Sequence, residues 1–290
     1  MKILITGTNG FLGRNLKEHF ENGKCSLHYP KRDDLNLLDT SKVENYIKNN
    51  NFDVIIHSSV TLESIDQNLK MYFNIERLSE YYGKLICIGS GAEFNSKFYI
   101  PKMTEDYFGK YPPSKNDIYG YSKYVIAKNI LEKKRNIFNL RVFGIYGKYE
   151  DYRRRLISNN ICRILSGLHV SINKNTYFDY MYVDDFVKIV DLFINSEPKE
   201  TTYNTCTGEI IDFLTIAKLI NNIEVNSKNI EIKNQGMNKE YSGDNTKLKN
   251  EFKDIEFTDP KICIENLYNW YKYNSKLVFD DKIFDKWIKN

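Results

Sequence analysis

The sequence is poor in the residues that build disulfide frameworks and metal centres. Its 290 residues include five cysteines and four histidines. The cysteines are odd in number, lie far apart and mostly stand among apolar residues, so we expect reduced thiols in a cytoplasmic protein. The histidines have neither the mutual spacing nor the neighbouring cysteine pairs of a zinc site, so we predict no metal.

Long apolar runs and clusters of basic residues are also missing. The apolar stretch at the N-terminus is too short for a signal peptide, and no run approaches the roughly 20 residues of a membrane span. The net charge of +4 is spread along the chain, without a basic arm or a nucleic-acid motif. We therefore expect neither a membrane nor a nucleic acid as a partner. The 41% of hydrophobic residues is enough for a large core.

The chain begins instead with a strand, a glycine turn and a helix. Residues 1–13 read MKILITGTNGFLG, in which an aliphatic run typical of a buried strand precedes the glycines. Gly7 permits a tight turn, Gly10 lets the backbone approach a pyrophosphate, and Gly13 allows close packing of helix on strand. The amides at the start of the helix then face the phosphates. This context predicts a dinucleotide site formed by Gly7, Thr8, Asn9, Gly10, Phe11, Leu12 and Gly13.

Acidic residues are missing just after the second predicted strand, residues 25–28. A free ribose 2′-hydroxyl is usually bound by an acidic residue there, whereas a 2′-phosphate needs positive charge. This chain has Lys31 and Arg32, and an arginine can make paired hydrogen bonds to a phosphate. We therefore predict NADP(H), although two solvated surface charges would give the same pattern.

A third predicted strand, residues 52–60, ends in small polar residues. In a doubly wound fold the carboxyl ends of the parallel strands line the cofactor crevice. Ser58 and Ser59 are therefore candidate cofactor contacts. We interpret His57, just before them, as a packed structural histidine rather than a catalytic one.

Two segments supply the candidate catalytic residues. The strand predicted at residues 84–89 leads into Ser90, and residues 117–123 read DIYGYSK, which places Tyr119 and Lys123 on one helix face. A nearby ammonium favours the phenolate form of a tyrosine, and a serine hydroxyl can hold a carbonyl or carbinol oxygen. A second YxxxK runs from Tyr124 to Lys128, and we interpret it as an exposed helical pair.

The glycine spacing and the Ser, Tyr and Lys set resemble the extended short-chain dehydrogenase/reductases that act on nucleotide sugars. The interval from Ser90 to Tyr119 (119 − 90 = 29) matches the serine-to-tyrosine spacing of the GDP-fucose synthases. The string RDDLNLLD at residues 32–39 resembles the same region of that family. The resemblance implies an α/β fold, with a Rossmann doubly wound parallel sheet and a smaller C-terminal α/β lobe. It also implies that Arg32 faces the 2′-phosphate, that Leu38 and Asp39 lie by the adenine, and that Lys123 and Tyr119 contact the cofactor.

The residues that follow Ser90 narrow the implied reaction. The 4,6-dehydratases of this superfamily carry Asp-Glu directly after the catalytic Thr or Ser. This chain has Gly91 and Ala92 there, and Glu93 stands one place too late. A local shift of the backbone could still bring Glu93 into the position of the dehydratase acid. GDP-fucose synthases epimerise C3 and C5 with a cysteine and a histidine, and the matching positions are Ala92 and Leu156. Neither can move a proton, so the resemblance implies a reductase without epimerase function.

Residues 149–163 are rich in arginine and asparagine at helical spacing. A solvated helix and a bed for the pyrophosphate of the substrate are equally open interpretations. The resemblance favours the second, because Phe178 stands where an arginine often touches the nucleotide. The candidate substrate contacts are Ser90, Arg153, Arg155, Asn160 and Arg163. Residues 262–290 predict an amphipathic helix in which Trp270, Tyr271 and Trp287 pack.

Together these features predict an NADPH-dependent C4 reductase of a nucleotide-linked 4-keto (6-deoxy) sugar. The resemblance favours GDP as carrier, surface polysaccharide biosynthesis as role and a homodimer as assembly. We assign residues 1–147 and 176–202 to the NADP(H)-binding domain, and residues 148–175 and 203–290 to the nucleotide-sugar lobe. An NAD-dependent nucleotide-sugar 4-epimerase is the alternative enzyme. A non-catalytic dinucleotide-binding protein is a further alternative, against which the Ser, Tyr and Lys set argues.

Overall fold

The aliphatic runs of the sequence form a six-stranded parallel sheet. The computed structural model describes residues 1–133, 136–224 and 229–274. The sheet order is β10-β5-β4-β3-β1-β2, so the chain turns to one side of β1 for β2 and to the other side for β3. A ligand crevice forms at such a reversal, outside the carboxyl ends of the strands. The strands are β1 (Lys2–Thr6), β2 (Ser26–His28), β3 (Phe52–His57), β4 (Tyr82–Ser90), β5 (Ile137–Val142) and β10 (Thr202–Thr205).

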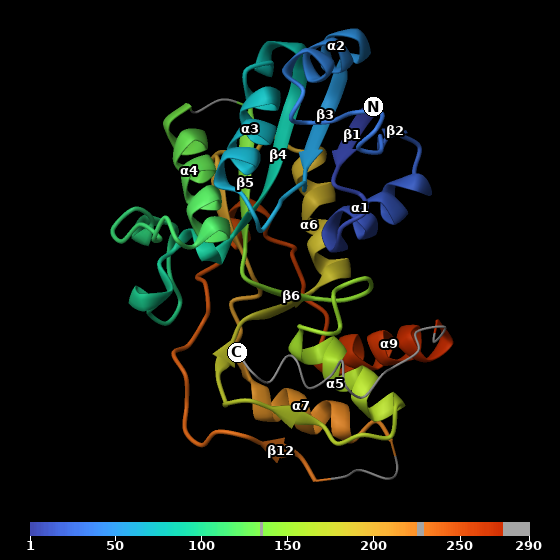
Figure 1. Cartoon of the computed structure of the whole chain (residues 1–290), viewed down its shortest axis with the longest axis vertical. Coiled ribbons are helices and arrows are strands. Elements are labelled where there is room, and N and C mark those ends of the chain that lie inside the picture. The colour runs from blue at the N-terminus through green and yellow to red at the C-terminus, as the bar shows by residue number, and fades with distance from the viewer. Residues whose placement is uncertain (134–135, 225–228, 275–290) are drawn as a thin grey trace.

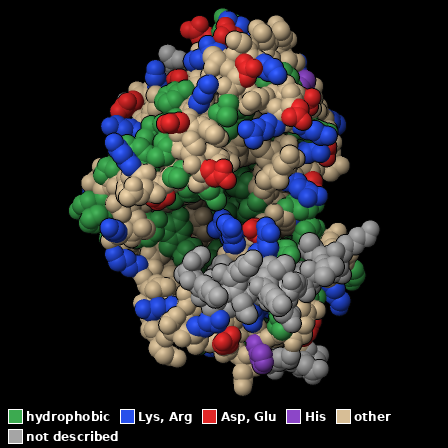
Figure 2. Space-filling view, viewed as in Figure 1, with side chains coloured by type: hydrophobic (Ala, Val, Ile, Leu, Met, Phe, Trp, Pro, Cys, Tyr) green, Lys and Arg blue, Asp and Glu red, His purple; other side chains and the backbone are tan. Residues whose placement is uncertain are grey.

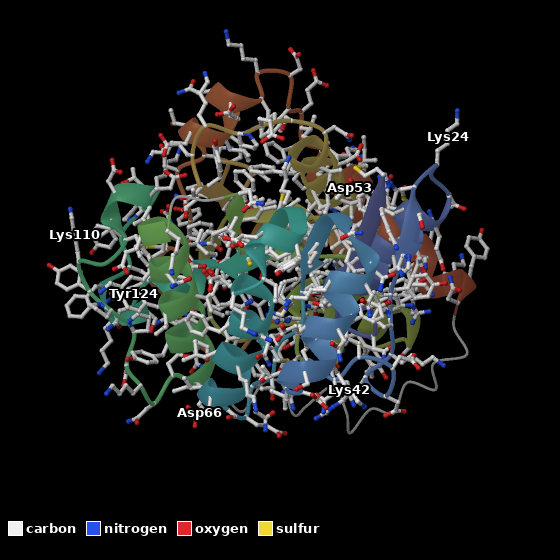
Figure 3. The ribbon with its side chains drawn as sticks, turned by 90° about the horizontal axis from the view of Figure 1, so that it is seen from above. Lys24, Lys42, Asp53, Asp66, Lys110 and Tyr124 are labelled. Atoms are coloured by element: carbon white, nitrogen blue, oxygen red, sulfur yellow. The ribbon has the colours of Figure 1, made fainter. Side chains whose placement is uncertain are left out.

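Helices cover both faces of this sheet (Figure 1). Alternation along the strands explains why: Ile3 and Ile5 pack with one helix layer, while Leu4 packs with the other. The first layer is α1 (Phe11–Glu21) with α6 (Val183–Ile194). The second is α2 (Thr40–Asn50), α3 (Ile65–Glu76) and α4 (Ile118–Lys133), which lie side by side in Figure 3. The predicted doubly wound fold is confirmed.

A second hydrophobic core lies below the sheet in Figure 1. It forms where α5 (Leu156–Leu165), α7 (Phe213–Asn221) and α9 (Pro260–Tyr273) pack together. The predicted C-terminal helix is thus confirmed as far as Tyr273, with Tyr271 buried and the ring of Trp270 edge-on to Tyr149. Trp287 lies outside the described residues.

Short elements join the two cores. β6 (Gly144–Tyr146) pairs in parallel with β9 (Tyr180–Tyr182), and α8 (Thr246–Glu251) packs beside β10, with Leu248 in the core of the sheet. Packing therefore favours assigning β10 and α8 to the sheet unit, while the proposed lobe boundaries stay a prediction. The other elements are β7 (Ser171–Ile172), β8 (Tyr177–Phe178), β11 (Ile211–Asp212), β12 (Glu231–Ile232), and the 3-10 turns η1 (Ser79–Tyr81), η2 (Gly91–Glu93), η3 (Ser96–Phe98) and η4 (Glu105–Tyr107).

Candidate active site

A cavity of about 1120 Å³ runs from the carboxyl ends of the strands to the second core. Figure 2 shows this face hollowed between the two parts of the molecule, with hydrophobic side chains gathered in the hollow and basic side chains at its edge. Most of the predicted site residues line this one cavity. They are Gly7, Thr8, Asn9, Gly10, Phe11, Leu12, Gly13, Arg32, Leu38, Ser58, Ser59, Ser90, Tyr119, Lys123 and Arg155.

The glycine loop has the geometry that a dinucleotide needs. Gly7 has a φ of 75°, and a Cβ on Gly13 would stand 2.2 Å from the Gly7 carbonyl oxygen. Gly10 caps α1 without a side-chain hydrogen bond, and the first turn of α1 contains no acidic residue. The first amides of the helix therefore keep their donors for a ligand phosphate. The pyrophosphate of a nicotinamide dinucleotide fits this cradle.

The segment after β2 brings positive charge to the same cavity. Lys31 and Arg32 line it, and Arg32 makes no ion pair with any residue that the structure describes. We expect Asp39 beside the adenine from the resemblance, but in the structure Asp39 does not line the cavity. Its carboxylate accepts from the Lys42 amide at 3.0 Å and caps α2, a role for which aspartate is well suited.

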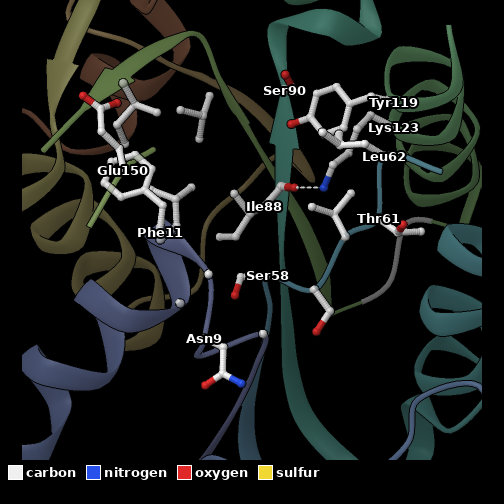
Figure 4. A pocket seen from close by; sticks show the side chains of 18 of the residues that line it. Asn9, Phe11, Ser58, Thr61, Leu62, Ile88, Ser90, Tyr119, Lys123 and Glu150 are labelled. Atoms are coloured by element: carbon white, nitrogen blue, oxygen red, sulfur yellow. Dashed lines mark hydrogen bonds between the residues drawn. The ribbon is translucent and has the colours of Figure 1, made fainter. Parts of the chain in front are cut away.

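The three predicted catalytic side chains meet where β4 ends beside α4 (Figure 4). Lys123 is buried, and its ammonium donates to the Ile88 carbonyl oxygen at 2.5 Å. The same ammonium lies 5.8 Å from the centre of the Tyr119 ring. One strand and one helix thus fix the hydroxyl of Ser90, the phenol of Tyr119 and a cation beside each other.

The second YxxxK copy lies outside the cavity. The ring of Tyr124 packs 5.0 Å from that of Phe108, and Lys128 is exposed, 4.0 Å from Glu132. Only one face of α4 meets β4, so only one of the two YxxxK copies can reach the site. The structure therefore confirms Lys128 as exposed and shows Tyr124 to be half-buried.

His57 has the structural role that the sequence predicted. Its Nδ1 lies 3.0 Å from the Thr6 hydroxyl, and its side chain is buried outside the cavity lining. Burial, followed by the charge of Lys123, lowers the pKa of His57 to about 3. A ring that stays neutral at neutral pH suits packing between strands.

Glu93 is turned away from the cavity. Its carboxylate accepts from the Ser90 amide at 2.9 Å and from the Arg141 guanidinium at 2.6 Å. The guanidinium carbon lies between the rings of Phe94 and Phe108, at 4.7 and 4.8 Å. The local shift that would make Glu93 a dehydratase acid does not occur, because the carboxylate is bound behind the serine. No sequence pattern marks Arg141, which stands in an ordinary buried strand.

The arginine-rich segment reaches the cavity only in part. Arg155 and its neighbour Arg154 line it, but Arg153 points to solvent and pairs with Asp151 at 2.7 Å. The predictions for Asn160 and Arg163 are not supported. The Asn160 amide donates to backbone oxygens at 3.0 Å within the second core, and Arg163 donates to a backbone oxygen at 2.6 Å. Nearly all of α5, from Leu156 to Ile164, is buried, and helical spacing alone could not show that its polar residues would lie inside the second core.

The sequence also missed an aromatic wall and a buried acid. The wall lines the same cavity as Ser90 and consists of Phe143, Phe178, Tyr180, Phe213 and Tyr241. The acid is Glu150, whose Oε1 accepts from the Ser158 hydroxyl. Burial raises the pKa of Glu150 to about 7. Figure 4 shows Glu150 beside Phe11, apart from Ser90 and Tyr119. Phe178 was singled out only as the residue that replaces an arginine, and no local motif marks Phe143, Phe213, Tyr241 or Glu150.

Residues 3–206 match the family described as the NAD dependent epimerase/dehydratase family. The chain belongs to this family. Its members are epimerases, reductases and dehydratases of nucleotide sugars that bind a nicotinamide cofactor. In the part of the chain that the structure describes, no group of His, Cys, Asp and Glu could hold a metal ion, and no helix is long and apolar enough to cross a membrane.

One sequence relative and two solved structures illustrate the similarity. An ADP-L-glycero-D-manno-heptose-6-epimerase from Brachyspira hyodysenteriae is 23% identical over 267 residues, 76% of this chain and 80% of the relative. The structure of a GDP-L-fucose synthetase from Naegleria fowleri superposes with a TM-score of 0.82 at 15% identity, covering 96% of this chain and 94% of the other. That of a GDP-mannoheptose C4 reductase from Campylobacter jejuni with NADP bound gives 0.75 at 20% identity, covering 93% and 98%. At these identities the structural likeness establishes the fold.

Proposed function

We propose that the protein is an NADPH-dependent C4 reductase of a GDP-linked 4-keto (6-deoxy) sugar, without C3/C5 epimerase activity, and that it serves surface polysaccharide biosynthesis. The observation that carries the proposal is the composition of the cavity around Ser90, Tyr119 and Lys123. The two positions for an epimerase acid/base pair hold Ala92 and Leu156, and both line the cavity. Among the described residues, no cysteine or histidine lines it. This lining supports reduction of a ketone that already exists.

The chain's own residues account for the proton. A reduced nicotinamide cofactor held by the glycine loop and Arg32 would supply the hydride that C4 of the sugar receives. As the C4–O π bond breaks, Tyr119 gives its phenolic proton to the developing alkoxide, and Ser90 donates a hydrogen bond to the same oxygen. The Lys123 ammonium, held on Ile88, stabilises the phenolate that remains. The product is a secondary alcohol, and solvent returns the proton to Tyr119.

Support for the GDP carrier is independent of the catalytic centre. The two solved neighbours described above are named for GDP-linked sugars, whereas the sequence relative is named for an ADP-linked one. Arg154 and Arg155 on the cavity wall offer guanidinium groups for a pyrophosphate of any such carrier. A homodimer is part of the proposal on family resemblance alone.

Cofactor preference tests the role of Arg32. We expect the apoprotein to bind NADPH more tightly than NADH in a fluorescence titration. Arg32→Ala should weaken NADPH binding by about 10-fold to 100-fold, because it removes charge-assisted hydrogen bonds. NADH binding should change little. Lys24→Ala removes a cation whose side chain points away from the molecule in Figure 3, and it should leave both affinities unchanged.

A substrate panel tests the reaction itself. We expect oxidation of NADPH with a GDP-linked 4-keto sugar in preference to dTDP- and CDP-linked ones, and NMR of the product should show reduction at C4 with C3 and C5 unchanged. Retention of stoichiometric NAD through purification, with interconversion of 4-hydroxy epimers, would instead establish a 4-epimerase.

A further inference from the structure

Tyr241 brings a third hydroxyl to the catalytic centre from a distant part of the chain. It lines the cavity together with Ser90 and Tyr119. A Cβ added to Gly91 would stand 2.2 Å from the Tyr241 hydroxyl oxygen. That hydroxyl therefore lies against the backbone that directly follows Ser90, where only a glycine leaves room for it.

The position of Tyr241 is fixed from several sides. Its amide donates to the Tyr177 carbonyl oxygen at 3.0 Å, and its own carbonyl oxygen accepts from the Asp179 amide at 3.0 Å. Its ring centre lies 4.8 Å from that of Phe178 and 5.1 Å from that of Tyr99. A side chain held by two backbone hydrogen bonds and packed rings has little freedom, which is the condition for orienting another group.

The hydrogen-bond capacity of Ser90 gives this contact its meaning. A serine oxygen offers two acceptor positions and one proton. The Ala92 amide already donates to Ser90 Oγ at 3.1 Å. We propose that Tyr241 is a positioning residue whose hydroxyl donates to the second acceptor position, so that the single Ser90 proton is directed to the C4 carbonyl oxygen of the substrate. This inference rests on the proposed function, because a ketone can only accept.

Tyr241 has the properties of a permanent donor. Burial, followed by the neighbouring Tyr99, Tyr119 and Glu93, raises the pKa of Tyr241 well above its usual range. The phenol therefore keeps its proton at any pH at which the enzyme works. A chain of hydrogen bonds from Tyr241 through Ser90 to the substrate strengthens each member by polarisation.

A double-mutant cycle tests whether Tyr241 acts through Ser90. Tyr241→Phe keeps the packed ring and removes the hydroxyl, and we expect it to lower kcat about fivefold to tenfold, the value of one hydrogen bond. KM for the nucleotide sugar and the affinity for NADPH should stay within about twofold, since the bond strengthens catalysis rather than binding. In a Ser90→Ala background, itself about 100-fold slower, adding Tyr241→Phe should have almost no further effect.

Two further variants separate positioning from packing. Tyr99→Phe removes a hydroxyl from the same aromatic cluster, 5.1 Å away between ring centres, and should leave kcat unchanged. Gly91→Ala keeps Tyr241 but displaces its hydroxyl, and should reproduce the loss in kcat. An effect of Tyr241→Phe that persists undiminished in Ser90→Ala, or that appears only in KM and thermal stability, would overturn the inference.

The inference can fail or stand separately from the proposed reaction. If the protein proves to be a 4-epimerase, the same cycle is run on that reaction, because Ser90 holds the C4 oxygen there too. A crystal structure of the NADP-bound protein gives a readout that needs no substrate. Tyr241 and Ser90 oxygens within hydrogen-bond distance support the inference, and a longer separation overturns it.

Discussion

Glu150 is a buried acid whose protonation is linked to folding. Its pKa rises from 4.5 to about 7 on burial, so the folded state holds a proton that the unfolded chain releases between those two values. The contribution to stability is complete below pH 4.5 and is lost as the pH rises through 7. A shift of this size corresponds to about 3 kcal/mol. Glu150→Gln should therefore flatten the fall in stability between pH 5 and 8 that wild type shows in urea unfolding.

A matched substitution controls for loss of a carboxylate. Glu265 is exposed on α9, and Glu265→Gln should leave the wild-type pH profile unchanged. If the free energy of unfolding of Glu150→Gln changes with pH in parallel with that of wild type, then Glu150 ionises in the folded protein as freely as in the unfolded chain. The sequence could not single out Glu150, because its burial depends on how the segment after β6 folds over α5.

At the level of elements, the turn after β4 is held by a buried ion pair. Arg141 on β5 is 1% exposed, and its partner Glu93 in η2 is fully buried. Removing one member leaves an uncompensated charge, so we expect Glu93→Ala to lower the free energy of unfolding by about 3–5 kcal/mol. Replacing both, as Glu93→Leu with Arg141→Met, should recover only part of that loss, because it removes the unpaired charge but leaves the buried Ser90 amide without its acceptor.

The comparison is made in urea unfolding at constant pH. Glu132→Ala, which breaks the exposed pair with Lys128 at 4.0 Å, should cost less than about 1 kcal/mol. If the double variant is as unstable as Glu93→Ala, the loss in free energy of unfolding comes from the altered shape of the site and not from the unpaired charge.

Local sequence predicted the elements whose signal is contained within a few residues. The strand, glycine turn and helix at residues 1–21 are such a unit, and so are the tyrosine and lysine on one face of α4. The predictions for Asp39, Asn160 and Arg163 did not anticipate the partners that their side chains have in the structure, because capping and burial are decided by tertiary packing. Tyr241 was beyond reach, since it is one of 22 tyrosines and meets Ser90 only through the fold.

At the scale of the whole molecule, one cavity connects the sheet with the second core, so ligands at its two ends should stabilise the fold independently. A ligand at 100 times its Kd adds about 2.7 kcal/mol, roughly 5 to 10 °C in Tm for a chain of this size. We expect NADP and GDP each to raise Tm in differential scanning fluorimetry. The rise with GDP should exceed that with CDP or dTDP if GDP is the carrier.

Two neighbouring arginines test where the nucleotide of the substrate binds. Arg155 lines the cavity and makes no side-chain cap to α5, so Arg155→Ala should reduce the Tm rise with GDP while leaving the rise with NADP intact. Arg153 carries the same charge two residues away but points to solvent and pairs with Asp151. Arg153→Ala should therefore leave both rises unchanged. Equal effects of the two variants on GDP would show that the arginines act through net charge, whereas the expected difference would locate the pyrophosphate on the wall where the second core meets the sheet.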